Sequence, residues 1–249
     1  MVERLGAILD QHGIPSVYLY GSVALDDFRL GWSDIDILCL ARTSLTQDEA
    51  NNLVGLRQTL LQEYPRNLYF RSFEGAILSG DAFLMHKPEN VVYWGTSGER
   101  IVDQYALDPF SMIELIDSGI LLCGNDIRNT LTYPTSDEII KAILNHYSIV
   151  RKYAASTGRS VRSGGWLLDI ARCLYTLHTG KVISKTGAGE WAIENKLVPD
   201  IAVMQQVLEI RRNPMSFRKD TAILDWSATL GGPIQRFADV LGKELERGG

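Results

Sequence analysis

Two acidic residues near the start of the chain are spaced so that they could act together. Asp34 and Asp36 lie in the segment 34–41, whose apolar composition predicts a strand. Side chains two apart on a strand share a face, so both carboxylates should lie on one face while Ile35 points into the core. Neighbouring carboxylates repel each other unless a cation lies between them, and Mg²⁺ accepts one or two carboxylates together with substrate phosphates. The pair therefore predicts a magnesium site.

A second feature precedes the acidic pair. An apolar strand at 16–20 leads into Gly21-Ser22, where a helix is expected to begin. Backbone N–H groups at the start of a helix can receive phosphate. Chemistry on a nucleoside triphosphate needs both a phosphate cradle and a metal site. The alternative is an exposed turn before an acidic strand edge, but carboxylates on a buried strand are costly without a role.

The ordered combination resembles a known signature. An apolar strand, Gly21-Ser22, Ser33-Asp34-x-Asp36 and a second apolar strand are similar to the DNA polymerase beta-like nucleotidyltransferase superfamily. The resemblance implies that Gly21, Ser22 and Ser33 bind the nucleotide and that Asp34 and Asp36 bind Mg²⁺.

A third acidic residue, Glu74, lies in a predicted strand at 67–79 among mostly apolar neighbours. The acceptor hydroxyl of a transfer reaction must lose a proton, which calls for a general base. Glu74 is the candidate, either as this base or as a third carboxylate of the metal site. The alternative is that it pairs with Arg71 or faces solvent. Residues 80–107 mix Gly, Pro and aromatic residues and are expected to be irregular.

The character of the chain changes after Pro134. Helical periodicity dominates from there on, with helices expected to about residue 155 and at 165–179, 187–195, 199–212 and 231–247. We therefore predict an α+β protein with a nucleotidyltransferase domain at 1–133, built on a small mixed sheet with flanking helices. An all-helical domain at 134–249 would close the active-site cleft.

The helical half of the chain resembles one particular family within this superfamily. Its run from Asp169 to Ala192 is similar to the C-terminal helical domain of the bacterial aminoglycoside adenylyltransferases that modify streptomycin and spectinomycin. The shared residues are Arg172, Tyr175, Thr179-Gly180-Lys181, Lys185 and Trp191-Ala192. The resemblance implies that Lys185 reaches the triphosphate of ATP, that Arg172 faces the same cleft, and that Glu74 is the catalytic base.

Other interpretations of these helical residues remain open. Lys185 could be a solvated loop lysine, and Arg172 could form a structural ion pair with Asp169 or Glu190. Trp166 and Asp169 are weak candidates for binding the substrate, with Trp166 otherwise a core residue.

The stretch 151–162 carries four basic residues and no acidic residue. If it lines the cleft, it disfavours the polycation streptomycin and favours spectinomycin or a neutral or anionic acceptor. If it is a solvated loop, it does not affect specificity.

The composition of the chain argues against some classes of binding partner. The 249 residues have a net charge of −5, divided into −9 over 1–130 and +4 over 131–249. An acidic chain without a basic track argues against nucleic acid, and no apolar run approaches the length of a membrane span. Three scattered cysteines are expected to be buried free thiols, which fits a reducing compartment. We therefore expect a cytoplasmic protein that acts as a monomer.

Together these features predict an Mg²⁺-dependent enzyme that transfers AMP from ATP to a hydroxyl of a small molecule and releases pyrophosphate. An aminoglycoside-type antibiotic is the expected acceptor, with spectinomycin favoured. The alternatives are the same chemistry on a protein or on another metabolite, or a nucleotide-binding module without catalysis.

Overall fold

The computed structural model describes residues 1–10, 13–95 and 98–248. Within these residues the chain forms two compact units. The sheet unit comprises Met1–Leu25 and Asp34–Tyr133, and the helical unit comprises Asp26–Ser33 and Pro134–Gly249. The short segment Asp26–Ser33, between the Gly-Ser turn and the acidic pair, thus belongs to the helical unit. None of the described helices combines the length and the apolar character needed to cross a membrane.

The sheet unit is built on one mixed sheet. Among the described residues its strand order is β5-β4-β3-β2-β1-β6, with β2 and β3 parallel and the other neighbouring pairs antiparallel. Its strands are β1 (Ser16–Tyr20), β2 (Ile35–Ala41), β3 (Phe73–Ser79), β4 (Val91–Gly95), β5 (Gly98–Val102) and β6 (Ile120–Cys123). Its helical segments are α1 (Val2–Ile8), α2 (Gly21–Ala24), α3 (Gln47–Glu63), η2 (Leu68–Ser72), α4 (Gly80–Met85), α5 (Pro109–Ser118) and η3 (Arg128–Thr130).

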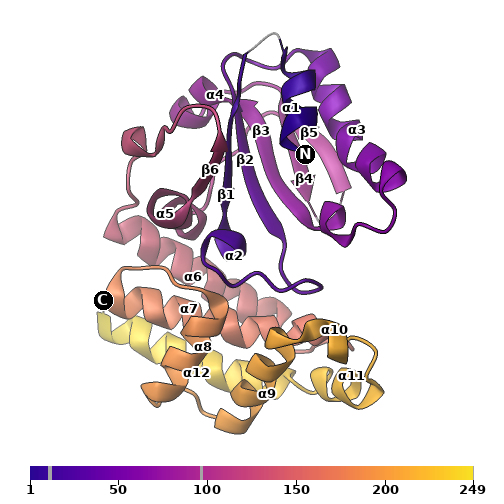
Figure 1. The fold of residues 1–249 in the computed structure, drawn as a ribbon. Helices are drawn as coiled ribbons and strands as arrows, with labels where there is room; N and C mark the ends of the chain where they lie inside the picture. The colour runs from indigo at the N-terminus through magenta and orange to yellow at the C-terminus, as the bar shows by residue number, and fades with distance from the viewer. Residues whose placement is uncertain (11–12, 96–97, 249) are drawn as a thin grey trace. The chain divides into compact units, whose positions relative to one another are not determined.

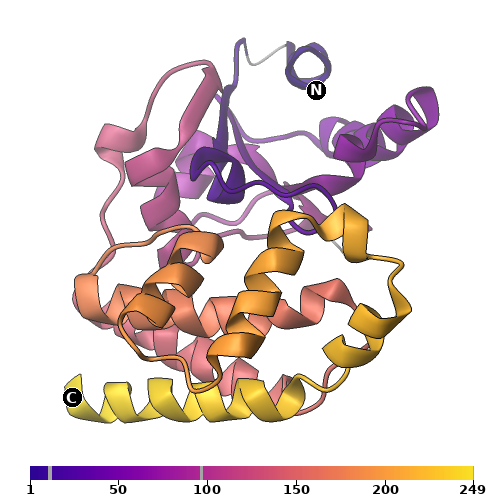
Figure 2. The same cartoon turned by 60° about the horizontal axis from the view of Figure 1, so that its bottom comes forward.

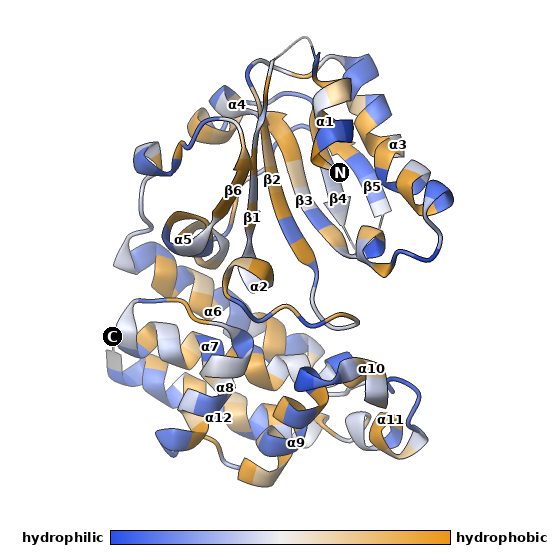
Figure 3. Cartoon of the chain, in the orientation of Figure 1, coloured by the Kyte–Doolittle hydropathy of each residue, from blue (hydrophilic) through white to orange (hydrophobic). Residues whose placement is uncertain are grey.

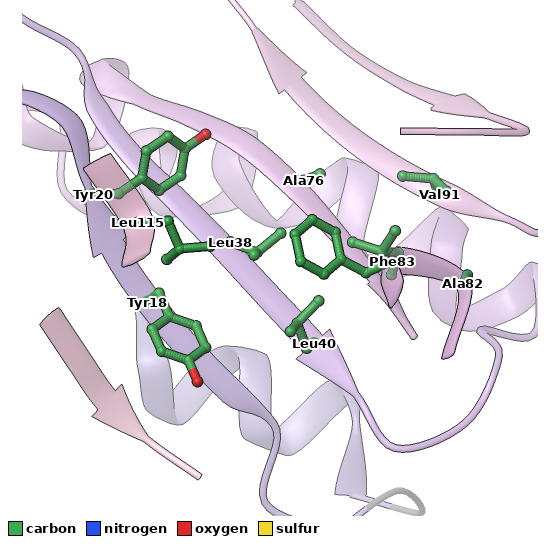
Figure 4. Close-up of a cluster of buried hydrophobic side chains, with 10 residues drawn as sticks. Tyr18, Tyr20, Leu38, Leu40, Ala76, Ala82, Phe83, Val91 and Leu115 are labelled. Carbon is green, nitrogen blue, oxygen red and sulfur yellow. The ribbon is translucent and has the colours of Figure 1, made fainter. Parts of the chain in front are cut away.

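Helices lie on both faces of this sheet. In Figure 1, α1 and α3 cover one face of the sheet, and α5 covers the other face. The face towards α4 and α5 is an apolar cluster in which Phe83 and Leu115 from these helices meet Tyr18, Leu38 and Leu40 from the strands (Figure 4). Figure 3 shows the hydrophobic residues of the central strands in orange. The core therefore fixes which face each residue of β2 and β3 must present.

The helical unit contains helices and no strand among its described residues, as the sequence predicted. Its helices α6, α7 and α12 pack against one another, and Figure 2 shows α12 in yellow at the end of the chain. Its segments are α6 (Ser136–Tyr153), η4 (Val161–Gly164), α7 (Gly165–Thr179), α8 (Lys185–Glu194), α9 (Ile201–Arg212), α10 (Pro214–Phe217), α11 (Thr221–Ser227) and α12 (Gly231–Gly248).

The predicted α+β class is confirmed, and two local predictions are wrong. The third strand does not extend over 67–79, because residues Leu68–Ser72 form a 3-10 turn and β3 begins at Phe73. Residues 80–107 are not irregular either, since they contain α4, β4 and β5. Ser79 caps α4 by accepting a hydrogen bond from the backbone of Ala82, a signal that the glycines and prolines nearby obscured.

Candidate active site

Asp36 and Glu74 lie directly opposite each other on the parallel strands β2 and β3. Two residues further along, Leu38 and Ala76 form the next pair on the same face and belong to the apolar cluster. Because side chains alternate along a strand, this packing directs both carboxylates to one face. Both residues are half-buried. Neighbouring strands lie about 4.8 Å apart, so the two acidic groups form one negatively charged site.

Gly21 is required by the position of Asp36. Its φ is +63°, in the left-handed region that favours glycine. A Cβ atom added at this position would lie 2.1 Å from Oδ2 of Asp36. Any other residue would therefore displace the carboxylate, which explains why glycine precedes Ser22 in the motif.

Ser22 connects the turn to the acidic strand. Its hydroxyl donates a hydrogen bond to the backbone oxygen of Asp34 at 3.2 Å. Asp34 immediately precedes β2, and the buried Ile35 separates it from Asp36, as the predicted alternation requires. The helix α2 that begins at Gly21 is a single turn of four residues. The sheet unit thus brings together Gly21, Ser22, Asp34, Asp36 and Glu74.

Three tyrosines surround the two carboxylates. Tyr93 donates a hydrogen bond to Oε1 of Glu74 at 2.7 Å, and the hydroxyls of Tyr20 and Tyr105 are 3.3 Å apart. Burial raises the pKa of Tyr105 to about 12, and burial together with the neighbouring Tyr105 and the Asp36 charge raises the pKa of Tyr20 well above its usual value. Tyr93 is therefore a neutral donor to Glu74, Tyr20 and Tyr105 share a hydrogen bond beside it, and sequence reasoning missed all three.

Gly75 permits the close approach of β3 to β2. Its φ is +139°, and an added Cβ would lie 1.8 Å from the backbone oxygen of Ile37. The glycine after Glu74 therefore serves the strand pairing that places Glu74 opposite Asp36.

The remaining predicted site residues lie in the helical unit. Lys185 is the first residue of α8, which Ser184 caps, and so does not lie in a loop. Lys185 forms an ion pair with Asp169 at 2.8 Å. Burial acts to raise the pKa of Asp169, but the charges of Lys185 and Arg172 outweigh it and hold that pKa below its usual value. Asp169 therefore pairs with Lys185, and the Arg172 charge also acts on it.

Two further predicted site residues of the helical unit are Trp166 and Ser33. Trp166 is half-buried at the start of α7, three residues before Asp169 on the same side of the helix. Ser33 is buried, and its hydroxyl accepts a hydrogen bond from the backbone of Arg29 at 3.1 Å. Ser33 is thus engaged in holding the segment Asp26–Ser33.

Asp27 is a buried residue that sequence reasoning missed. Its carboxylate accepts hydrogen bonds from Nη2 of Arg211 at 2.7 Å and from the hydroxyl and backbone N–H of Thr186 at 2.6 and 3.1 Å. Burial acts to raise the pKa of Asp27, but the Thr186 hydroxyl and the charge of Arg211 hold it below its usual value. The guanidinium also lies 5.6 Å from the Trp32 ring centroid. This network fixes the segment Asp26–Ser33 and the start of α8.

The basic stretch 151–162 lies on the surface of the helical unit. Arg151 pairs with Asp239 and Arg159 with Asp225, each at 2.9 Å. All four side chains are exposed. Acidic residues elsewhere in the same unit therefore offset part of the positive charge that the sequence displayed.

Asp34 and Asp36 are the residues predicted to hold a metal ion. Within the described part of the chain, no group of three or more His, Cys, Asp or Glu residues is arranged to hold a metal ion. The metal-binding prediction to be tested is therefore the pair of carboxylates of Asp34 and Asp36.

Two family models match separate parts of the chain. Residues 3–79 match the family model described as nucleotidyltransferase domain. Together with the mixed sheet and its acidic strands, this match defines the chain as a nucleotidyltransferase. Residues 134–221 match the model described as aminoglycoside adenylyltransferase, C-terminal domain. The chain belongs to the aminoglycoside adenylyltransferase family.

Individual relatives extend over most of the chain. Spectinomycin 9-adenylyltransferases of Staphylococcus aureus strains Mu50 and N315 are each 26% identical over 204 residues, which is 77% of this chain and 76% of the relative. Among solved structures, the spectinomycin adenyltransferase AAD(9) from Enterococcus faecialis, described with ATP and spectinomycin, has a TM-score of 0.62. It is 15% identical, and the match covers 97% of this chain and 98% of that chain. This likeness shows a shared fold.

Proposed function

We propose that this chain transfers AMP from ATP to a hydroxyl of spectinomycin and releases pyrophosphate. The observation that carries the proposal is the pairing of Asp36 with Glu74 on one face, beside the Gly21 turn. The names of the relatives, spectinomycin 9-adenylyltransferases, support the acceptor.

In this proposal Asp34 and Asp36 hold Mg²⁺, and Gly21, Ser22 and Ser33 contact the triphosphate. Two carboxylates would suit Mg²⁺, which is usually bound by one or two carboxylates together with substrate phosphates and water. When bound, the ion polarises the α-phosphate and offsets the charge of the pyrophosphate. Glu74 then accepts the proton of the acceptor hydroxyl.

The helical unit contributes cations to the nucleotide in the same proposal. Lys185 exchanges its ion pair with Asp169 for the triphosphate, and Arg172 acts beside it. The freed Asp169 then carries a negative charge that an aminoglycoside amine can approach, with Trp166 beside it.

We expect Lys185→Ala to raise KM for ATP by about tenfold or more, because a loss of 1.4 kcal/mol of binding energy is a tenfold change. Lys181→Ala is the matched control, because Lys181 is an exposed lysine between α7 and α8. Steady-state kinetics with varied ATP measures both. Equal KM values for the two variants would remove Lys185 from the nucleotide site.

The proposed function is tested by pyrophosphate release from ATP and Mg²⁺ with spectinomycin, with streptomycin or without an acceptor. We expect release that requires spectinomycin and stops when EDTA removes Mg²⁺. Release with streptomycin as well would mean that the basic stretch 151–162 does not select the acceptor. No release with either antibiotic would contradict the proposed acceptors and favour a protein or another metabolite.

A further inference from the structure

The register of the sheet places Tyr93 beside Glu74. Tyr93 on β4 is paired with Ala76, which follows Glu74 by two residues on the same face of β3. Tyr93 is therefore the diagonal neighbour of Glu74, a separation that a long side chain can span. Its phenol donates the hydrogen bond to Oε1 of Glu74 at 2.7 Å.

Two neighbours hold the ring of Tyr93 in turn. The guanidinium carbon of Arg100 lies 4.5 Å from the ring centroid, and the Tyr105 ring centroid is 6.0 Å away. Arg100 is the register partner of Tyr93 on β5, so the β4–β5 pair builds this support. A ring fixed by two contacts holds its hydroxyl in one place, and the hydroxyl in turn fixes the carboxylate.

The direction of this hydrogen bond follows from chemistry. An ionised carboxylate accepts and does not donate, so the phenol must be the donor. Burial, followed by the hydrogen bond with Glu74, raises the pKa of Tyr93, and the phenol keeps its proton. The bond uses one lone pair of Oε1, so Oε2 is the oxygen better able to take up a proton.

We propose that Tyr93 is a positioning residue that fixes the Glu74 carboxylate for proton transfer from the acceptor hydroxyl. The proposal rests on the proposed function, in which Glu74 is the general base. In that step the acceptor O–H bond breaks and its proton passes to Oε2 of Glu74. The acceptor oxygen bonds to the α-phosphorus of ATP, and pyrophosphate leaves with the electron pair of the broken P–O bond.

The test begins with Tyr93→Phe in the full chain, assayed with ATP, Mg²⁺ and spectinomycin. We expect kcat to fall about 10–100-fold, the usual effect of removing a group that orients a catalytic ligand. KM for ATP should stay at the wild-type value, because Tyr93 acts on the base. Tyr133→Phe is the matched control, because it removes another phenol–carboxylate bond, the one from Tyr133 to Asp117 at 3.2 Å. Tyr133→Phe should keep wild-type turnover. Both variants should keep the circular dichroism spectrum of the wild type.

A double-mutant cycle distinguishes positioning from a structural effect. In the Glu74→Gln background, Tyr93→Phe should cause no further fall in the residual turnover, because no base remains to be oriented. Equal losses in both backgrounds, or a raised KM for ATP with normal kcat, would overturn the proposal. Normal turnover of Glu74→Gln alone, or none in the wild type, would instead show that the proposed function has failed, and this proposal would fall with it.

Discussion

Asp27 of the helical unit and Glu74 of the sheet unit are both held by hydrogen bonds, but their partners differ in charge. The cation Arg211 contacts Asp27, whereas the neutral phenol of Tyr93 contacts Glu74. Asp169 also has a cationic partner, Lys185, but that pair is more exposed, and in the proposed function Lys185 leaves it to bind ATP. A cationic partner neutralises a buried carboxylate and makes it structural, whereas a neutral donor orients the group and leaves its negative charge in place. The contrast separates acidic groups that hold the fold from an acidic group that can accept a proton.

The largest expected change in stability is at Asp27. Asp27→Asn keeps the shape of the side chain and leaves the buried charge of Arg211 without its counter-ion. We expect a loss of about 3–5 kcal/mol in the free energy of unfolding, the usual result of breaking a buried pair. Urea unfolding followed by circular dichroism measures it. Combining the change with Arg211→Met should recover part of the loss, and additive losses would contradict a direct pairing.

An intermediate effect is expected with pH. The folded-state pKa values of Asp27 and Asp169 lie below their unfolded values, so both groups stabilise the fold above the unfolded pKa of about 3.9. This contribution is lost as the pH falls through the folded-state values. We expect the urea midpoint of the wild type to fall between pH 5 and about pH 3, and to fall less in Asp27→Asn. The same acid dependence in both proteins would show that Asp27 is not the group responsible.

The smallest effect is expected at Asp225, which pairs with Arg159 on the surface. Asp225→Asn makes the same chemical change as Asp27→Asn, but both partners are exposed. We expect a change of no more than about 1 kcal/mol in the free energy of unfolding, the usual range for exposed pairs. If the free energy of unfolding fell as much as in Asp27→Asn, buried and exposed ion pairs would not differ in their contribution to stability, which would contradict the account.

Much of the fold and the class of site could be predicted from the sequence, because their signals are local. The Thr46–Glu49 capping box at the start of α3 is one such local signal, and periodicity predicted Gly165–Thr179 with the observed bounds of α7. The Gly-Ser turn and the alternation around Ile35 likewise placed β1 and β2.

The missed features depend on contacts between distant residues. Arg211 follows its partner Asp27 by 184 residues, and no local pattern links them. Tyr93 was missed because β4 lies in a segment whose glycine, proline and aromatic residues hide the strand pattern, and its contact with Glu74 arises only from the register of β3 and β4. The roles of Arg172, Lys185, Trp166 and Asp169 towards ligands stay predictions.

One measurement tests most directly whether the acidic residues of the sheet serve the reaction rather than the stability of the fold. It compares Asp36→Asn with the wild type and with Asp225→Asn, in pyrophosphate release and in urea unfolding. Asp36 lies opposite Glu74, so removing its charge relieves repulsion between two carboxylates while removing a proposed Mg²⁺ ligand. We predict that turnover falls at least about a thousandfold, equivalent to about 4 kcal/mol in the barrier, with stability unchanged or raised. Wild-type turnover, or a loss of stability as large as that of Asp27→Asn, would contradict the account.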